Sequence, residues 1–545
     1  MKNWVAQLNY TIDMAKTQGD HDPRNGQTVY QITIRPEERL SAVRIDLREI
    51  ELGSPAAERD EELQDYFIES EAFRRLANGN KRIVIGNRGA GKSAIFQYIA
   101  RTEKSNPRTS IIELVPENYS YELLRETMVA EREGAWQKQS AYAAAWKYLL
   151  YILVMKAVVK KGGKPSGKSA LGRISKYLRD NHAGAQNDRL SALISYLKRL
   201  EGVKLGKFEG SIKTRELQKL YKLEELDRLM PDLREVLDDQ RVIILVDELD
   251  KGWDESEDAK AFVAGLFQAC QSLNAVSANM RLYMSLRQEL YENIPALYED
   301  AQKMRDLIET VRWEEAGLKR LVARRIRHSL LRGSHGSVEG VLDRLSDDDL
   351  WKELFAETLA YRNNNSFNYL IDRTLYRPRE IIQFCTQAIE QANYDSQFVP
   401  IDYDTIVSAE HVYSEERAQD IAAEYRFQYS DLLVVFEEFR GETYTFDRDD
   451  LEGLCLEIIT KDRPAGLNLD WLEGYGPEEL IDVLWRVGFL KARAVGGIKG
   501  RSRSGSKWLG QYQASSLNLP NIMQFQVHPM FRSWLSMREP KGNRQ

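Results

Sequence analysis

Two stretches decide the fold: KRIVIGNRGAGKS at residues 81–93 and VIILVDE at residues 242–248. In the first, a short apolar run leads into residues 86–93, which fit the phosphate-loop pattern G-x-x-x-x-G-K-[ST] in full. In the second, an apolar run ends in Asp247 and Glu248. The pair predicts a site for a nucleoside triphosphate, with ATP as the expected nucleotide and Mg²⁺ as the metal.

The residue types in both stretches suit this chemistry. Glycines let the loop curl so that backbone N–H groups face the phosphates, and the helix that follows presents its positive end to them. Lys92 is expected to neutralise phosphate charge, Ser93 and Asp247 to hold the metal, and Glu248 to orient and deprotonate the attacking water. The predicted nucleotide-binding residues are Gly86, Asn87, Arg88, Gly89, Ala90, Gly91, Lys92, Ser93 and Ala94.

A second match to the same pattern occurs at residues 162–169, GGKPSGKS. An Ala- and Leu-rich run, residues 141–159, precedes it and is typical of a long helix. A phosphate loop requires a short strand at that place, so this copy is interpreted as a basic loop.

Composition favours a soluble protein of several domains. The chain has 545 residues, of which 43% are hydrophobic and 29% charged, and its net charge of −6 gives no global bias towards nucleic acid. Its three widely spaced cysteines predict no disulfide framework and favour the cytoplasm. No signal peptide is recognised, and the longest apolar run, residues 148–155, is too short to span a bilayer, so no membrane partner is expected.

The predicted fold class is α/β. Residues 1–56 form an N-terminal segment without an assigned role, although residues 28–34 resemble a strand. Residues 57–300 are predicted to form the P-loop core, a parallel sheet flanked by helices, with a helical insertion at about 120–238. A helical lid at residues 301–400 and a C-terminal winged-helix-like domain at residues 401–545 are expected to follow.

Further site residues are expected around this core. Ser285 lies near the end of a predicted strand at 281–286 and Arg287 just past it, where P-loop proteins with an extra strand sense the γ-phosphate; a structural salt bridge is the alternative. Pro378 suits the first position of a helix, which would place Arg377 and Arg379 where a lid sets a second sensor arginine. The alternative there is a capping or surface arginine pair.

The C-terminal domain carries a basic stretch. Residues 478–490 predict an amphipathic helix, and residues 491–510 contain six basic and no acidic residues. A helix followed by a hairpin with a basic tip suggests a winged helix that contacts phosphates through Lys499, Arg501, Arg503 and Lys507. A solvated loop in a protein-interaction domain is the alternative.

Several blocks resemble a family of bacterial P-loop ATPases related to the KAP and STAND groups, with an additional strand as in AAA+ proteins. They are GSPAAERDEELQDYFIESEAF, IGNRGAGKSAI, VIILVDELDKGW, LYMSLRQELY, VRWEEAGLKRLVARRI, RTLYRPREIIQFC and FQVHPMFRSWL. The resemblance implies an ATPase with a helical lid and a winged domain, and supports Lys92, Ser93, Asp247, Glu248, Arg287 and Arg379 as site residues. Such proteins are often encoded beside anti-phage defence genes. Because no effector motif is present, it also implies a separate effector partner.

The leading hypothesis is an ATP-hydrolysing switch that assembles as a homo-oligomer and regulates a separate effector. A DNA-binding ATPase, a loader or remodeller that uses the winged domain, is the second. A nucleotide-binding scaffold that barely hydrolyses is the third, and Glu248 argues against it. No signature of ABC-type ATPases or of guanine specificity is found in the sequence.

Overall fold

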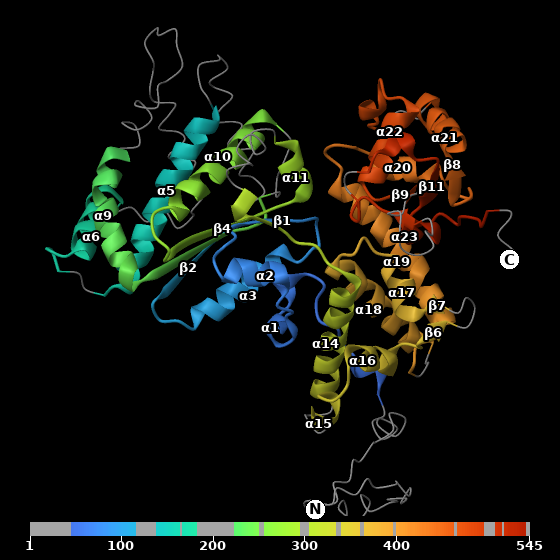
Figure 1. Ribbon diagram of the computed structural model, residues 1–545, viewed down its shortest axis with the longest axis horizontal. Helices are drawn as coiled ribbons and strands as arrows, with labels where there is room; N and C mark the ends of the chain where they lie inside the picture. The colour runs from blue at the N-terminus through green and yellow to red at the C-terminus, as the bar shows by residue number, and fades with distance from the viewer. Residues whose placement is uncertain are drawn as a thin grey trace, which may run out of the picture. The chain divides into compact units, whose positions relative to one another are not determined.

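The computed structural model describes residues 45–115, 138–163, 166–182, 223–249, 256–294, 305–333, 339–359, 364–395, 399–462, 466–494, 507–514 and 517–540. The chain divides into two compact units, Met1–Ile45 and Asp46–Gln545. All elements named below belong to the second unit (Figure 1). The strand predicted at residues 28–34 lies outside the described residues.

A five-stranded parallel sheet forms the core, in the order β2-β3-β4-β1-β5. β4 lies between β1 and β3, so the extra strand predicted between the two motif strands is present. The predicted P-loop NTPase core is therefore confirmed as the fold. The strands are β1 (Ile83–Ile85), β2 (Thr109–Leu114), β3 (Arg241–Val246), β4 (Met280–Leu286) and β5 (Ile308–Thr310).

Two hydrophobic layers cover the sheet, because successive side chains of a strand point to opposite faces. On β3, Val242, Ile244 and Val246 belong to one cluster, while Ile243 and Leu245 belong to the other. Parallel sheets are covered on both faces, which explains why the strands are apolar runs without alternation. Helices α5 (Lys138–Lys161) and α10 (Glu257–Asn274) supply the first cluster, and α2 (Glu71–Ala77) and α3 (Lys92–Lys104) supply the second.

Helix α5 is the longest part of the insertion and packs directly on α10 (Figure 1). The approach is close: a Cβ built on Gly265 of α10 would lie 2.7 Å from the Cβ of Tyr142. Residues Tyr142–Lys161 are long and apolar enough to cross a membrane by length and composition, but 61% of that window is buried inside the protein. The long helix predicted over residues 141–159 is therefore present, and its contacts with α10 account for its apolar character.

The other described parts of the insertion, α6 (Ala170–His182) and α9 (Leu223–Asp239), are helical, as predicted. One expectation was wrong. The predicted helical lid begins at residue 301, but β5 lies at 308–310 and pairs with β1, beyond the predicted end of the core at residue 300. A three-residue strand gives too short a pattern to recognise, and β5 is defined by its pairing with β1.

The lid region is built from helices, together with the short antiparallel pair β6 (Thr358–Leu359) and β7 (Asn364–Asn365). α14 packs on α16, and α18 packs on α19. α19 also contacts α20 and α23, which follow it, so its contacts join the regions on both sides of the predicted boundary at residue 400. The helices are α14 (Glu315–Gly333), α16 (Asp347–Leu354), α17 (Ser366–Ile371), α18 (Pro378–Tyr394) and α19 (Tyr403–Glu424).

The C-terminal region combines helices with a small sheet, and its assignment as a winged-helix-like domain stays a prediction. Its four strands form an antiparallel sheet in the order β10-β9-β11-β8, and the predicted amphipathic helix is α22, whose Leu480, Ile481 and Leu484 are buried. The elements are α20 (Leu432–Glu437), β8 (Thr445–Asp447), α21 (Arg448–Thr460), α22 (Pro477–Arg486), β9 (Leu490–Ala494), β10 (Lys507–Leu509), β11 (Gln524–Val527) and α23 (Pro529–Arg532).

Candidate active site

The phosphate loop connects β1 to α3, as the motif requires. Gly89 and Gly91 have φ of +78° and +94°, a left-handed conformation that other residues adopt at a cost. Gly86 is needed for a different reason: a Cβ there would lie 3.3 Å from the Cβ of Ala90 and 3.4 Å from the carbonyl oxygen of Val311. The loop is therefore shaped by its glycines into a tight cradle at the start of α3.

Lys92 folds back over this loop. Its Nζ donates to the carbonyl oxygens of Gly86 at 2.7 Å and Asn87 at 3.0 Å. An ammonium group at this place carries positive charge inside the curl of the loop. Phosphate oxygens are stronger acceptors for it than neutral carbonyl groups.

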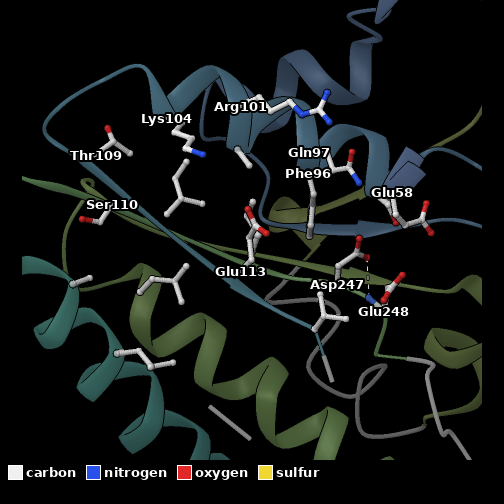
Figure 2. Close-up of a pocket in the computed structure, with 18 of the residues that line it drawn as sticks. Glu58, Phe96, Gln97, Arg101, Lys104, Thr109, Ser110, Glu113, Asp247 and Glu248 are labelled. Atoms are coloured by element: carbon white, nitrogen blue, oxygen red, sulfur yellow. Dashed lines mark hydrogen bonds between the residues drawn. The ribbon is translucent and has the colours of Figure 1, made fainter. Parts of the chain in front are cut away.

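Asp247 follows β3, and its carboxylate is held by two donors. Its Oδ1 accepts from the backbone N–H of Glu248 at 2.9 Å, the bond drawn in Figure 2, and from the hydroxyl of Ser285 at the end of β4. Ser285 is 2% exposed. The structure thus brings Ser285 to the predicted metal ligand and explains why a polar residue ends a buried strand.

Glu248 has φ of +56°, which is unusual for a residue with a side chain. Strained backbone of this kind is concentrated at functional sites. Glu248, Asp247 and Ser93 line one cleft of about 1480 Å³, and Figure 2 shows both carboxylates at its edge, near Glu58. The predicted metal ligands and the predicted base therefore share one space.

Arg379 reaches the loop from the lid. Pro378 occupies the first turn of α18, as predicted, and the backbone N–H of Arg379 lies 3.4 Å from the carbonyl oxygen of Gly89. Arg379 lines a second cavity, of about 110 Å³, together with Gly91, Lys92 and Ser93. Burial lowers the pKa of Arg379, and the nearby Arg88 lowers it further.

Arg377 has a structural contact instead. It precedes α18, and its Nη1 lies 2.7 Å from the carboxylate of Glu424. The two arginines of the predicted pair therefore differ: Arg379 faces the loop and Arg377 is held within the lid.

Arg287 lines neither of the two cavities. Its Nη1 forms an ion pair with Glu289 at 3.3 Å, which is the alternative considered from the sequence, and its role as a phosphate sensor stays a prediction. Burial first, and then Glu424, raise the pKa of Glu289, Arg287 opposes the shift, and the resulting pKa is about 7. Arg287 therefore belongs to a charge cluster beside the site.

The residues present fit a magnesium ion. A serine hydroxyl and one carboxylate are hard oxygen ligands, and Mg²⁺ in such sites takes its other ligands from phosphates and water. Within the described ranges, no group of three or more His, Cys, Asp or Glu residues could hold a metal by itself. Ser93 and Asp247 need no such group, because the nucleotide would complete the ligand set.

Two residues at the site carried no prediction. Trp313, after β5, donates its indole N–H to the carbonyl oxygen of Ala90 at 2.9 Å, and Glu58 lines both cavities. Both residues lie in blocks that carried the family resemblance, and the block order was the only signal for them.

The basic wing is described only in part. Lys499, Arg501 and Arg503 lie outside the described residues, and Lys507 is exposed on β10. Lys491, counted in the basic stretch, is 7% exposed on β9, and burial lowers its pKa. It therefore belongs to the sheet and not to the basic tip.

Two further expectations are confirmed. The rejected second loop pattern follows α5, a helix, where a phosphate loop would need a strand. The three cysteines, Cys270, Cys385 and Cys455, are buried and form no disulfide.

The parallel sheet, the inserted strand and the loop before α3 define a P-loop NTPase fold. Residues 316–422, from α14 to α19, match the family model described as a FunZ-associated C-terminal helical domain. This match extends past the predicted lid boundary at residue 400.

Similarity to curated proteins is also found. The chain is 25% identical over 395 residues to a putative transposon gamma-delta 80.3 kDa protein of Escherichia coli strain K12, covering 71% of this chain and 53% of that protein. The chain thus spans about half the length of this relative.

Among solved structures, the ORC2 protein of Aeropyrum pernix, in ADPNP–ADP complexes, aligns over 87% of this chain and 96% of its own, with 10% identity and a TM-score of 0.33. Cdc6p of Pyrobaculum aerophilum aligns over 83% and 92%, with 10% identity and a TM-score of 0.29.

Proposed function

We propose that this protein is a magnesium-dependent switch that binds and hydrolyses ATP. One observation carries the proposal: Ser93 of the phosphate loop lines both cavities, with Asp247 and Glu248 on one side and the lid residue Arg379 on the other. With the catalytic pair on one side and a cation from a separate helical region on the other, a bound nucleotide would contact both and could change the position of the lid.

Each side chain has a role in this proposal. The loop N–H groups and Lys92 bind the phosphates, and Ser93 and Asp247 hold Mg²⁺, which when bound neutralises charge on the transferred phosphoryl group. Glu248 orients a water molecule and accepts its proton. Arg379 contacts the terminal phosphates from the lid, and Arg287 joins it by leaving Glu289.

The partners also belong to the proposal. The ATP form assembles as a homo-oligomer and acts on a separate effector protein in the cytoplasm, as the resemblance to defence-linked P-loop ATPases implies. The buried, unpaired cysteines support a reducing compartment. The proposal of a separate effector and of a role in anti-phage defence rests on the resemblance to KAP- and STAND-related P-loop ATPases.

Light scattering of the full chain with and without ATP tests the switch. We expect a larger species with ATP in the wild type and none with Lys92→Ala, whose ATP affinity should fall by about tenfold or more. Lys92 contacts loop carbonyl groups and packs in no core cluster, so the variant should unfold near the wild-type temperature. An ATP-independent size for the wild type would contradict the switch.

A DNA-binding ATPase remains the second candidate. The winged-helix-like region, with Lys507 exposed next to the basic stretch at residues 495–506, favours it. The Escherichia coli relative bears the name of a transposon protein, and a transposon is a DNA element.

A salt titration of DNA binding separates the candidates. If the wing binds phosphates, replacing Lys499, Arg501, Arg503 and Lys507 with Ala should weaken binding and flatten its salt dependence. Replacing Arg74 on α2 and Lys352 on α16, both exposed and outside the cavities described above, is the matched control and should change neither. Strong stimulation of ATP hydrolysis by DNA would favour this candidate over the effector-regulating switch.

A further inference from the structure

Glu424, the last residue of α19, holds a buried negative charge next to the phosphate loop. Its side chain is 2% exposed, and its Oε2 accepts from Nη1 of Arg377 at 2.7 Å. Its Oε1 is buried and has no hydrogen-bond partner within the described part of the chain. A buried carboxylate oxygen without a partner costs free energy, so this one calls for an explanation.

A small cavity supplies that explanation. It has a volume of about 20 Å³, lies where the loop meets α18 and α19, and is lined by Glu424 together with Arg88, Arg377, Arg379 and Arg417. Such a volume holds about one water molecule. The carboxylate of Glu424 therefore shares this space with four guanidinium groups from the loop and the lid, and with two further acidic residues, Glu380 and Asp420.

The charges around this cavity are not evenly paired. Arg417 pairs with Asp420 at 2.6 Å, and Arg377 pairs both with Glu424 at 2.7 Å and with the buried Glu380 at 3.5 Å. Among the residues that the structure describes, Arg88 and Arg379 form no ion pair. Two neighbouring cations repel each other, and the lowered pKa of Arg379 reflects its burial first and then this repulsion.

Glu424 is charged despite its burial. Burial acts to raise its pKa, but Arg377, Arg287 and Arg88 together hold the pKa below the usual range of a glutamate. Arg377 donates a hydrogen bond to this carboxylate, whereas Arg88 is attracted to it by charge across the cavity that both residues line.

We propose that Glu424 is a positioning residue of the nucleotide site, whose buried carboxylate attracts Arg88 across the cavity that both line and so offsets the repulsion between Arg88 and Arg379 beside the phosphate loop. This inference rests on the proposed ATPase function, which it deepens. Without the carboxylate, the two arginines would move apart, and Arg379 would lose its direction towards the cavity that it shares with Lys92 and Ser93.

Glu424→Gln tests the proposal, because it removes the charge and keeps the shape. Glu410 is the matched control: it lies on the same helix, is 5% exposed, and is held by Arg373 at 2.7 Å and by the hydroxyl of Tyr369. Glu410 lines neither the phosphate-loop cavity nor the small cavity.

We expect Glu424→Gln to lower kcat for ATP by about tenfold or more, which is what the loss of a directed cation at the phosphates gives. Glu424→Asp, which keeps the charge, should recover part of that loss. Glu410→Gln should keep kcat within about twofold of the wild-type value, even if it lowers the unfolding temperature as much as Glu424→Gln does. Equal loss of kcat in both Gln variants would contradict the proposal, because it would reflect stability alone.

A double-mutant cycle in the nucleotide-free protein gives a second readout, which does not depend on hydrolysis. Glu424→Gln should lower the unfolding temperature less in an Arg88→Gln background than in the wild type. In that background, the repulsion between Arg88 and Arg379 that Glu424 offsets is already absent. Additive effects of the two substitutions on the unfolding temperature would overturn the proposal. So would a coupled cycle in which Glu424→Gln leaves kcat unchanged. If the wild type hydrolyses no ATP, the proposed function fails, and the cycle alone decides whether Glu424 holds Arg88.

Discussion

Arg379 of the lid lies directly against Gly89 of the phosphate loop. The Arg379 N–H lies 3.4 Å from the Gly89 carbonyl oxygen, and a Cβ built on Gly89 would come within 3.1 Å of the Arg379 Cβ. The lid therefore contacts the backbone of the phosphate loop directly. The close approach is possible because Gly89 has no side chain beyond a hydrogen. If nucleotide binding changed the conformation of the loop, the start of α18 would therefore have to move with it.

Gly89→Ala should disturb both the loop and the lid. The substitution forces a side chain into a left-handed conformation, at about 1–2 kcal/mol, and pushes on Arg379. Gly91→Ala is the matched control, because Gly91 is also left-handed but a Cβ there meets nothing within 4 Å. We expect ATP hydrolysis to fall further in Gly89→Ala than in Gly91→Ala; equal losses would mean that the lid contact has no function.

The raised pKa of Glu289 predicts a pH-dependent stability. Burial first, and then Glu424, raise this pKa from its ordinary value of 4.5 to about 7 in the folded protein. The folded state therefore binds more protons than the unfolded state between these values, and stability decreases as pH rises from about 4.5 to 7. The full difference is on the order of 3 kcal/mol.

Thermal unfolding from pH 5 to pH 8 checks this. Glu289→Gln should lose part of the decrease that the wild type shows, because the amide never ionises. Glu292→Gln, an exposed position on the same short helix, α11 (Gln288–Asn293), should keep the wild-type profile. Identical profiles for all three proteins would show that Glu289 titrates normally.

A buried ion pair ties the segment that carries Glu58 to the lid. Asp60 and Arg325 of α14 are 3% and 5% exposed, and their side chains meet at 3.0 Å. Arg325 also donates to the carbonyl oxygen of Leu52, and its guanidinium lies 4.3 Å from the ring centre of Tyr66. Removing one partner leaves the other charge buried and unpaired, which costs about 3–5 kcal/mol.

Asp60→Asn should therefore lower the midpoint of urea unfolding strongly. Asp347→Asn breaks a comparable pair with Arg320 at 3.2 Å, but on the surface, and should cost about 1 kcal/mol or less. Similar midpoints for the two variants would mean that solvent reaches the Asp60–Arg325 pair.

The motif residues could be predicted from the sequence because their geometry is local. Lys92 and Ser93 follow the loop within a few residues, and Asp247 ends a strand recognisable by its apolar run. The fold class followed from the same two stretches. The domain bounds and the site roles themselves stay predictions.

Residues that act across the fold could not be found in this way. Glu424 lies 47 residues from its partner Arg377, and much farther along the chain from Arg88. In the sequence it is one acidic residue at the end of a helix, a common and unremarked position. β5 was missed for a related reason, since three residues become a strand through their pairing with β1.

The most direct test of the account is ATP turnover by Glu248→Gln beside the wild type. The account predicts that this variant binds ATP with near wild-type affinity. Its rate of ATP hydrolysis should be lower by a factor of roughly 100 or more, because the general base is lost. Glu257→Gln, an acidic residue that is 83% exposed at the start of α10, should hydrolyse ATP at the wild-type rate. Wild-type turnover by Glu248→Gln would contradict the assignment of Glu248 as the base, and no turnover by the wild type would contradict the proposed ATPase.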